Sequence, residues 1–121
     1  MADVVRVRNQ TRATVLAEQC RVARSLRDRT VGLLGRPSLP HGEGLWIERS
    51  PSIHMFFMRF AIDAVFVDAS ARVVRVAEDL RPWRIVGWAR GARDCLELPA
   101  GTVRRTGTMV GDELVLESAS A

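Results

Sequence analysis

Hydrophobic and polar positions alternate near both ends of this 121-residue chain. Valines interleave with arginines over residues 4–8, which is the period of two expected of a half-buried strand. A turn at residues 9–11 should return the chain as a second strand over residues 13–22. Residues 114–116 again combine β-prone apolar side chains, so we expect a closing strand there, followed by a small polar tail over residues 118–121.

One segment has the spacing of a helix rather than of a strand. Ser25 and Asp28 form a capping-box pattern, in which the serine hydroxyl accepts from a first-turn amide, so a helix should begin at Leu26. Gly35, followed by Arg-Pro, is a usual stop signal. We expect a short amphipathic helix that packs one face on the core. The predicted buried face carries Leu26, Thr30, Leu33 and Leu34.

The most apolar stretch lies at the centre of the chain, over residues 52–68. It holds all four phenylalanines and two of the four methionines. Its β-prone side chains predict two strands, 53–58 and 62–68, joined by a bend at 59–61. A further strand over residues 72–76 would complete an antiparallel meander.

The remaining apolar runs are short. We expect strands at 45–47 and 95–98, and one or two helical turns within 100–106. The segment after Asp79 has little regular pattern and should lie over the sheet. The chain is therefore predicted to be an α+β, mostly β fold: a small curved antiparallel sheet or barrel of about seven strands with one main amphipathic helix, in a single domain over residues 1–121.

Composition narrows the function classes. All 18 basic residues are arginine, a bias expected of a GC-rich coding sequence, so the net charge of +4 is weak support for a nucleic-acid partner and we expect none. Cys20 and Cys95 lie far apart without a Cys/His cluster, so no metal or other cofactor is expected. The first residues do not resemble a signal peptide, and no stretch approaches the ~18 apolar residues of a membrane span. We therefore expect a bacterial, cytoplasmic protein with reduced thiols and no membrane contact.

Three polar groups interrupt the central apolar stretch, namely His54, Arg59 and Asp63. Buried polar groups need partners, so these are candidates for a site. His54 shares a strand face with Met58 and would line an apolar pocket if the Ile53 face is core; a structural histidine bonded to backbone is the alternative. Arg59 and Asp63 flank the predicted bend, where they would form either a salt bridge or a ligand-facing pair.

The segment after Asp79 offers an indole ring and two guanidinium groups. Trp83 stands between Arg81 and Arg84, a combination that can grip a carboxylate, a phosphate or a sugar; a tryptophan tucked over the core is the alternative. We therefore place a candidate ligand site in a cleft between the central hairpin and the Trp83 segment. Its predicted residues are His54, Met58, Arg59, Asp63, Trp83 and Arg84.

No nucleophile elbow, P-loop, dinucleotide-binding glycine motif or paired-carboxylate site is present, and no catalytic residue is assigned. The leading hypothesis is a non-enzymatic binding module for a small polar or anionic ligand or a peptide, with a small molecule or a protein as partner. The alternative is a small hydrolase or lyase in which His54 is the general base and Asp63 orients it. A third hypothesis is an RNA-binding β domain, which would gather its arginines on one face.

Motifs spread along the chain keep the order and spacing of a known family. They are the run Ile-His-Met-Phe-Phe-Met-Arg at 53–59 and shorter motifs at 30–36, 39–40, 44–46, 62–68, 96–101 and 111–112. Together they resemble the prokaryotic family called domain of unknown function family 192, over nearly the whole chain. Members often carry Pro before the Ile-Asp pair, where this chain has Ala61. The resemblance implies a small, mostly β fold with one main helix, and it supplies no catalytic residues because the family has no established activity.

Overall fold

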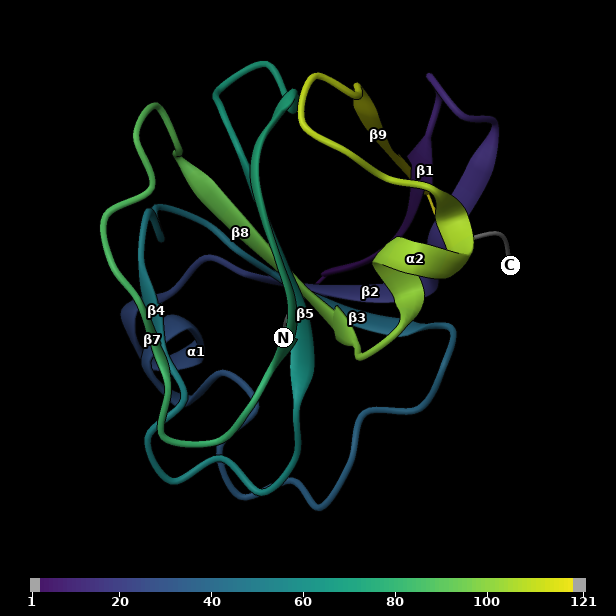
Figure 1. Cartoon of the computed structure of the whole chain (residues 1–121). Helices are drawn as coiled ribbons and strands as arrows, with labels where there is room; N and C mark the ends of the chain where they lie inside the picture. The colour runs from purple at the N-terminus through teal and green to yellow at the C-terminus, as the bar shows by residue number, and fades with distance from the viewer. Residues whose placement is uncertain (1–2, 119–121) are drawn as a thin grey trace.

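The computed structural model describes residues 3–118 as two β sheets and two short helices (Figure 1). The strands are β1 (Asp3–Asn9), β2 (Thr14–Ala23), β3 (Glu43–Ile47), β4 (Ile53–His54), β5 (Ile62–Val67), β6 (Val73–Leu80), β7 (Ile85–Val86), β8 (Asp94–Pro99) and β9 (Leu114–Ser118). The helices are α1 (Leu26–Val31) and α2 (Thr102–Thr106). Residues 119–121 of the expected polar tail lie outside the described residues. No helix within residues 3–118 is long and apolar enough to cross a membrane.

Seven strands form one curled sheet in the order β6-β5-β8-β3-β2-β1-β9, and β4 pairs with β7 in a separate, two-stranded sheet. Neighbouring strands are antiparallel except β2 and β3, which are parallel. The two ends of the large sheet meet where Arg72 pairs with Glu113, and the Leu114 amide donates to the carbonyl of Ala71 at 2.9 Å. The prediction of a mostly β fold built on a curved, seven-stranded sheet is confirmed.

The large sheet is covered on both faces, because every residue of β5 and β8 is buried. Alternation along β5 divides its side chains between two apolar clusters. The α1-side core joins Ile62, Ala64 and Phe66 to Leu33, Leu39, Ile53, Met55, Met58 and Val86. The α2-side core joins Val65 and Val67 to Leu16, Leu96, Leu98 and Val103. Figure 1 shows the same division, with α1, β4 and β7 on one side of the central strands and α2 on the other.

Helix α1 is shorter than the sequence predicts. Ser25 caps it as expected, because its Oγ accepts from the Asp28 amide at 3.0 Å. The helix nevertheless ends at Val31, since Gly32 has a φ of 51° and leaves the helical conformation. The predicted buried leucine face is wrong: Leu26 is 76% exposed, and Leu33, which is buried, lies beyond the helix end.

The predicted central hairpin is also wrong. Its first strand shortens to β4, which pairs with β7 rather than with β5. Phe57 has a φ of 63°, a left-handed conformation that ends the extended chain, and the Met58 amide donates to the carbonyl of Met55 at 3.2 Å in the resulting turn. The β5–β6 hairpin is confirmed. The segment after Asp79, predicted to be irregular, supplies the missing partner strand.

Candidate functional site

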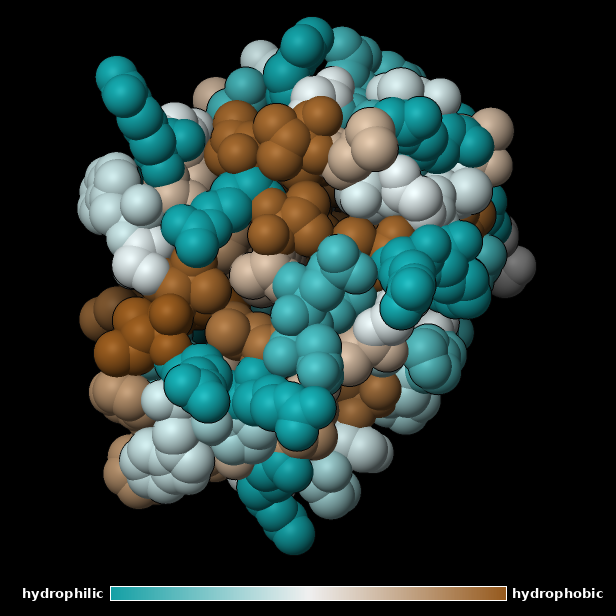
Figure 2. Space-filling model, viewed as in Figure 1, coloured by the Kyte–Doolittle hydropathy of each residue, from teal (hydrophilic) through white to brown (hydrophobic). Residues whose placement is uncertain are grey.

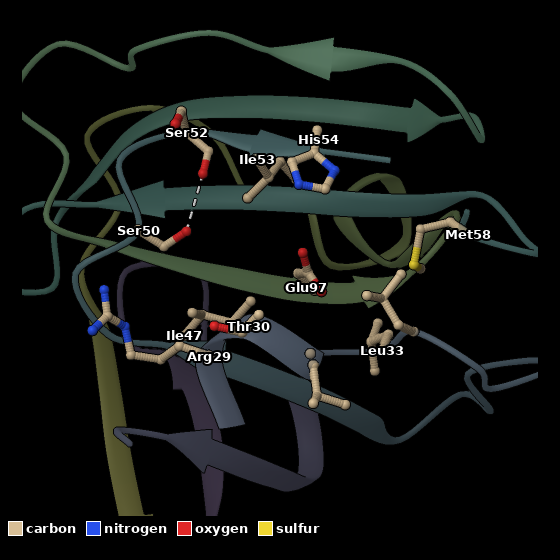
Figure 3. A pocket seen from close by; sticks show the side chains of 13 residues that line it. Arg29, Thr30, Leu33, Ile47, Ser50, Ser52, Ile53, His54, Met58 and Glu97 are labelled. Carbon is tan, nitrogen blue, oxygen red and sulfur yellow. Dashed lines mark hydrogen bonds between the residues drawn. The ribbon is translucent and has the colours of Figure 1, made fainter. Parts of the chain in front are cut away.

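A pocket of about 130 Å³ opens between α1 and the segment that carries β4 (Figure 3). One wall comes from α1 and the turn after it, another from residues 50–58, and the large sheet contributes side chains from β3 and β8. The lining residues are Arg29 to Leu34, Ile47, Ser50, Ser52, Ile53, His54, Met58 and Glu97. The pocket therefore combines apolar walls with a few polar groups, as small-molecule sites commonly do.

Glu97 is the acidic side chain of this pocket. It lies in the middle of β8, paired with Leu45 of β3 and Ala64 of β5, and alternation turns it toward the α1-side core. It is 7% exposed, and no described residue hydrogen-bonds to its carboxyl group, whose oxygens are not fully enclosed and open on the pocket. Burial raises the pKa of Glu97 to about 7, because the charged form loses hydration. At neutral pH the group is therefore divided between carboxylic acid and carboxylate.

His54 lies on the wall opposite Glu97, as Figure 3 shows. The pairing of β4 with β7 sets His54 against Ile85 and fixes its position at the pocket mouth. Its imidazole stacks on Phe56 with ring centroids 4.8 Å apart. No described residue hydrogen-bonds to the ring, so both nitrogens are available to a ligand.

Three other polar side chains of the lining are bonded to backbone. Thr30 Oγ1 donates to the carbonyl of Leu26 at 2.7 Å, and Ser50 Oγ donates to the carbonyl of Ser52 at 3.1 Å. Arg29 Nη2 donates to the carbonyl of Arg49 at 3.1 Å, while its buried Nε has no partner among the described residues. The groups left for a ligand are therefore the Glu97 carboxyl group, the His54 ring, the Ser52 hydroxyl and the Arg29 Nε.

Asp63 lies on the other face of the large sheet, away from the pocket. Its strand neighbours Ile62 and Ala64 belong to the α1-side core, so alternation turns Asp63 toward α2. Its fully buried carboxylate accepts backbone N–H bonds from Asp79, Gly101 and Val103 at 2.8, 3.0 and 2.9 Å. The expected ligand-facing role of Asp63 thus has no counterpart in this pocket.

Two predicted contacts of the Asp63 side chain, with Arg59 and with His54, are wrong. The salt bridge with Arg59 does not form. Arg59 is exposed, and the Asp63 carboxylate accepts hydrogen bonds from three backbone amides instead. The contact with His54 does not form either, since His54 lines the pocket on the opposite face of the sheet. The catalytic pair of the hydrolase hypothesis is therefore not assembled.

Met58 and Trp83 take different places around the pocket. Met58 is buried and lines it. Trp83 is outside the lining, but its ring lies 5.9 Å from Phe56 and 4.9 Å from Phe57 by centroids, so the rings of His54, Phe56, Trp83 and Phe57 form a row. Trp83 is 59% exposed, so it is not the buried lid considered as the alternative.

The surface around Trp83 is rich in exposed apolar residues. Phe57, Ile85 and Trp88 are 72%, 62% and 74% exposed. Figure 2 shows hydrophobic residues gathered on this side of the molecule, over β4 and β7, with hydrophilic residues between them. Arg59 and Arg84 are exposed here and form no ion pair with a described residue. The pocket itself lies between α1 and β4, and a ligand cleft beside the Trp83 segment stays a prediction.

Sequence reasoning missed Glu97 as a site residue, although a signal was present. Residues 95–99 read Cys-Leu-Glu-Leu-Pro, and a single acid within a buried apolar strand needs an explanation. Its strand neighbour Cys95 and the distant Cys20 are free and buried, and burial raises the pKa of both thiols, that of Cys20 to about 12. Neither thiol is suited to act as a nucleophile. Within residues 3–118, no group of three His, Cys, Asp or Glu side chains could hold a metal ion.

Comparisons with known proteins agree with this fold. The model of the family DUF192, described as "Uncharacterized ACR", matches residues 5–116. The UPF0127 protein of the archaeon Thermococcus sibiricus is 31% identical over 110 residues, which are 88% of this chain and 71% of the relative.

Two crystal structures share the fold at 23% sequence identity. A protein of unknown function from Novosphingobium aromaticivorans has a TM-score of 0.79 over 94% of this chain and 84% of its own. A protein from Sinorhizobium meliloti, named a "putative transcription regulator", has a TM-score of 0.81 over 96% of this chain and 94% of its own. At this identity the likeness concerns the fold alone. Since similar proteins come from archaea and bacteria, a bacterial source stays a prediction.

Proposed function

The chain belongs to the DUF192 family, and we propose that it is a binding module. The family itself has no established activity. Its site is the pocket between α1 and β4, and its ligand is a small polar molecule. The observation that carries this proposal is Glu97, a buried carboxyl group that faces the pocket without a hydrogen-bond partner among the described residues.

A carboxyl group in this position opposes folding. Its raised pKa shows that burial disfavours the charged form, although its oxygens still reach the open pocket. The strand neighbours of Glu97 are Leu45 and Ala64, so the same environment would suit an apolar side chain. A local conflict with folding of this kind is typical of functional sites.

The size and lining of the pocket support a small ligand. One water molecule needs about 10–15 Å³ measured in this way, so 130 Å³ holds a molecule of several non-hydrogen atoms. Leu33, Ile47, Ile53 and Met58 provide apolar walls. The free groups of Glu97 and His54 face each other across the space (Figure 3), an arrangement that would orient a polar ligand.

The two other functions considered from the sequence gain no support. A hydrolase or lyase built on His54 and Asp63 would require both side chains on one face of the sheet. An RNA-binding domain would require arginines gathered on one face. Arginines without an ion pair to a described residue instead lie on several elements, including Arg21 on β2, Arg75 on β6 and Arg104 on α2.

Three probes that share one carbon skeleton test the proposal: 3-methylbutylamine, 3-methylbutanoate and 3-methylbutanol. Backbone amide shifts would be followed by NMR at up to about 10 mM probe, where fragments this small can bind. At least one probe should shift the pocket residues in the wild type and in Glu78→Gln, an exposed acid of β6 that serves as a control. Glu97→Leu should abolish these shifts. The proposal fails if no probe shifts the pocket residues, or if Glu97→Leu responds like the wild type.

A further inference from the structure

We propose that the ligand of this pocket is a small, protonated aliphatic amine. Its ammonium group would lie against the Glu97 carboxylate, and its alkyl group would pack on Leu33, Ile53 and Met58. This inference rests on the proposed function, and it selects a cationic ligand over the anionic one that the sequence left open.

The charge of the pocket floor favours a cation. Glu97 has no basic partner among the described residues, although 18 arginines are present in the chain. Arg29, the arginine of the lining, donates to the carbonyl of Arg49, and Figure 3 shows its guanidinium group turned away from Glu97. An ammonium group would supply the missing donor through charge-assisted hydrogen bonds, which are stronger than neutral ones.

The groups around Glu97 leave room for that donor. The strands beside it present Leu45 and Ala64, and along its own strand Cys95 is a buried thiol. The other ionisable side chains of the pocket are His54, from β4, and Arg29, from α1. An ammonium group has three donors, so it can bond to the carboxylate and to a neutral imidazole nitrogen together.

The apolar wall fits the remainder of such a molecule. Leu33 is 2% exposed, and Ile53 and Met58 are each 9% exposed, so their packed side chains form one side of the pocket. A short alkyl chain placed there would lose contact with water, which favours binding. The volume of about 130 Å³ admits a short amine rather than a long polyamine.

The pH dependence of the binding affinity distinguishes an amine ligand from an anionic one. Burial raises the pKa of Glu97 to about 7, so below that pH the carboxylate must first lose a proton before it can pair with an ammonium group. Amine affinity should therefore weaken as the pH falls below about 7 and be constant above it. An anion would bind the protonated acid and show the opposite trend. His54 also lines the pocket, so any contribution of its ring to the pH dependence needs its own variant.

The test is the dissociation constant of 3-methylbutylamine at pH 8 and pH 6, followed by NMR. Wild type and Glu78→Gln should bind about tenfold more weakly at pH 6 than at pH 8. Glu97→Gln should bind weakly and without this dependence, because its side chain cannot ionise. His54→Gln should retain the tenfold dependence whatever its affinity. Loss of the dependence in His54→Gln would assign it to the imidazole and overturn the inference.

The matched probes separate failure of this inference from failure of the proposed function. If 3-methylbutanol binds as tightly as the amine, or if 3-methylbutanoate binds in its place and more tightly at pH 6, the amine assignment is overturned while a binding pocket remains. If none of the three probes binds, the proposed function falls as well. Preference for the amine with the stated pH trend supports both.

Discussion

The carboxylate of Asp63 accepts a hydrogen bond from the Val103 amide at 2.9 Å, and this contact ties the start of β5 to the first turn of α2. The same oxygen accepts from Gly101 at 3.0 Å, and the other oxygen accepts from Asp79 at 2.8 Å. The first amides of a helix have no partner within the helix. Asp63 supplies one from the sheet, which makes it a structural residue of the α2-side core.

Replacement of Asp63 should therefore affect folding. Asp63→Ala should lower the free energy of unfolding by about 2–4 kcal/mol, because three amides lose their acceptor. Asp63→Asn should lower it less, since one amide oxygen remains to accept. Urea unfolding followed by circular dichroism measures both, with the exposed Glu78→Gln as control. A loss below about 0.5 kcal/mol for Asp63→Ala would show that these hydrogen bonds contribute little.

Arg49 offers a test of backbone strain close to the pocket. Its φ of 56° lies in the left-handed region, which costs an L-residue about 1–2 kcal/mol. Its contacts with Asp94 and Arg29 are made through its own backbone N–H and C=O, so a glycine would keep them. Arg49→Gly should raise the free energy of unfolding by about 0.5–1 kcal/mol after the greater freedom of glycine in the unfolded chain is subtracted. Arg49→Ala keeps the strain, so an equal gain in that variant would contradict the explanation.

Glu97 should make stability depend on pH. Its pKa is about 7 in the folded chain and about 4.3 when unfolded, so between these values the folded state holds a proton that the unfolded state has released. Stability should therefore fall as the pH rises from about 4 to about 7, by as much as about 3 kcal/mol, and stay level above.

Glu97→Gln removes this titration. Thermal unfolding across the pH range should show the variant without that fall and more stable than the wild type at pH 8. The comparison isolates Glu97 because every other ionisable group is shared between the two proteins. Parallel curves for variant and wild type would mean that Glu97 titrates normally in the folded chain.

Local patterns predicted the elements that depend on local chemistry. Strands β1 and β2 were found from alternation, and the start of α1 from Ser25, whose hydroxyl bonds within the same turn. The end of β4 at His54 could not be found in this way, because residues 55–58 continue the apolar run. The left-handed Phe57 is set by its tertiary surroundings, where its ring lies 4.9 Å from that of Trp83.

The site was predicted in part. The sequence led to His54 and Met58, which line the pocket, but it also grouped Asp63 with them. Alternation alone separates Asp63 from Ile62 and Ala64, yet which face carries a pocket depends on long-range pairing that a single sequence does not reveal. Glu97 needs the same information, because the walls that face it come from α1 and β4, more than 40 residues earlier in the chain.

The most direct test of the central claim is an NMR titration of the Glu97 side-chain carboxyl group in the free protein, labelled with carbon-13 and assigned with Glu97→Gln. An unpaired, buried carboxyl group at the pocket floor predicts a midpoint of about 7. A midpoint near the ordinary glutamate value of about 4.3 would contradict the claim, because it would mean that the carboxylate is hydrated or already paired.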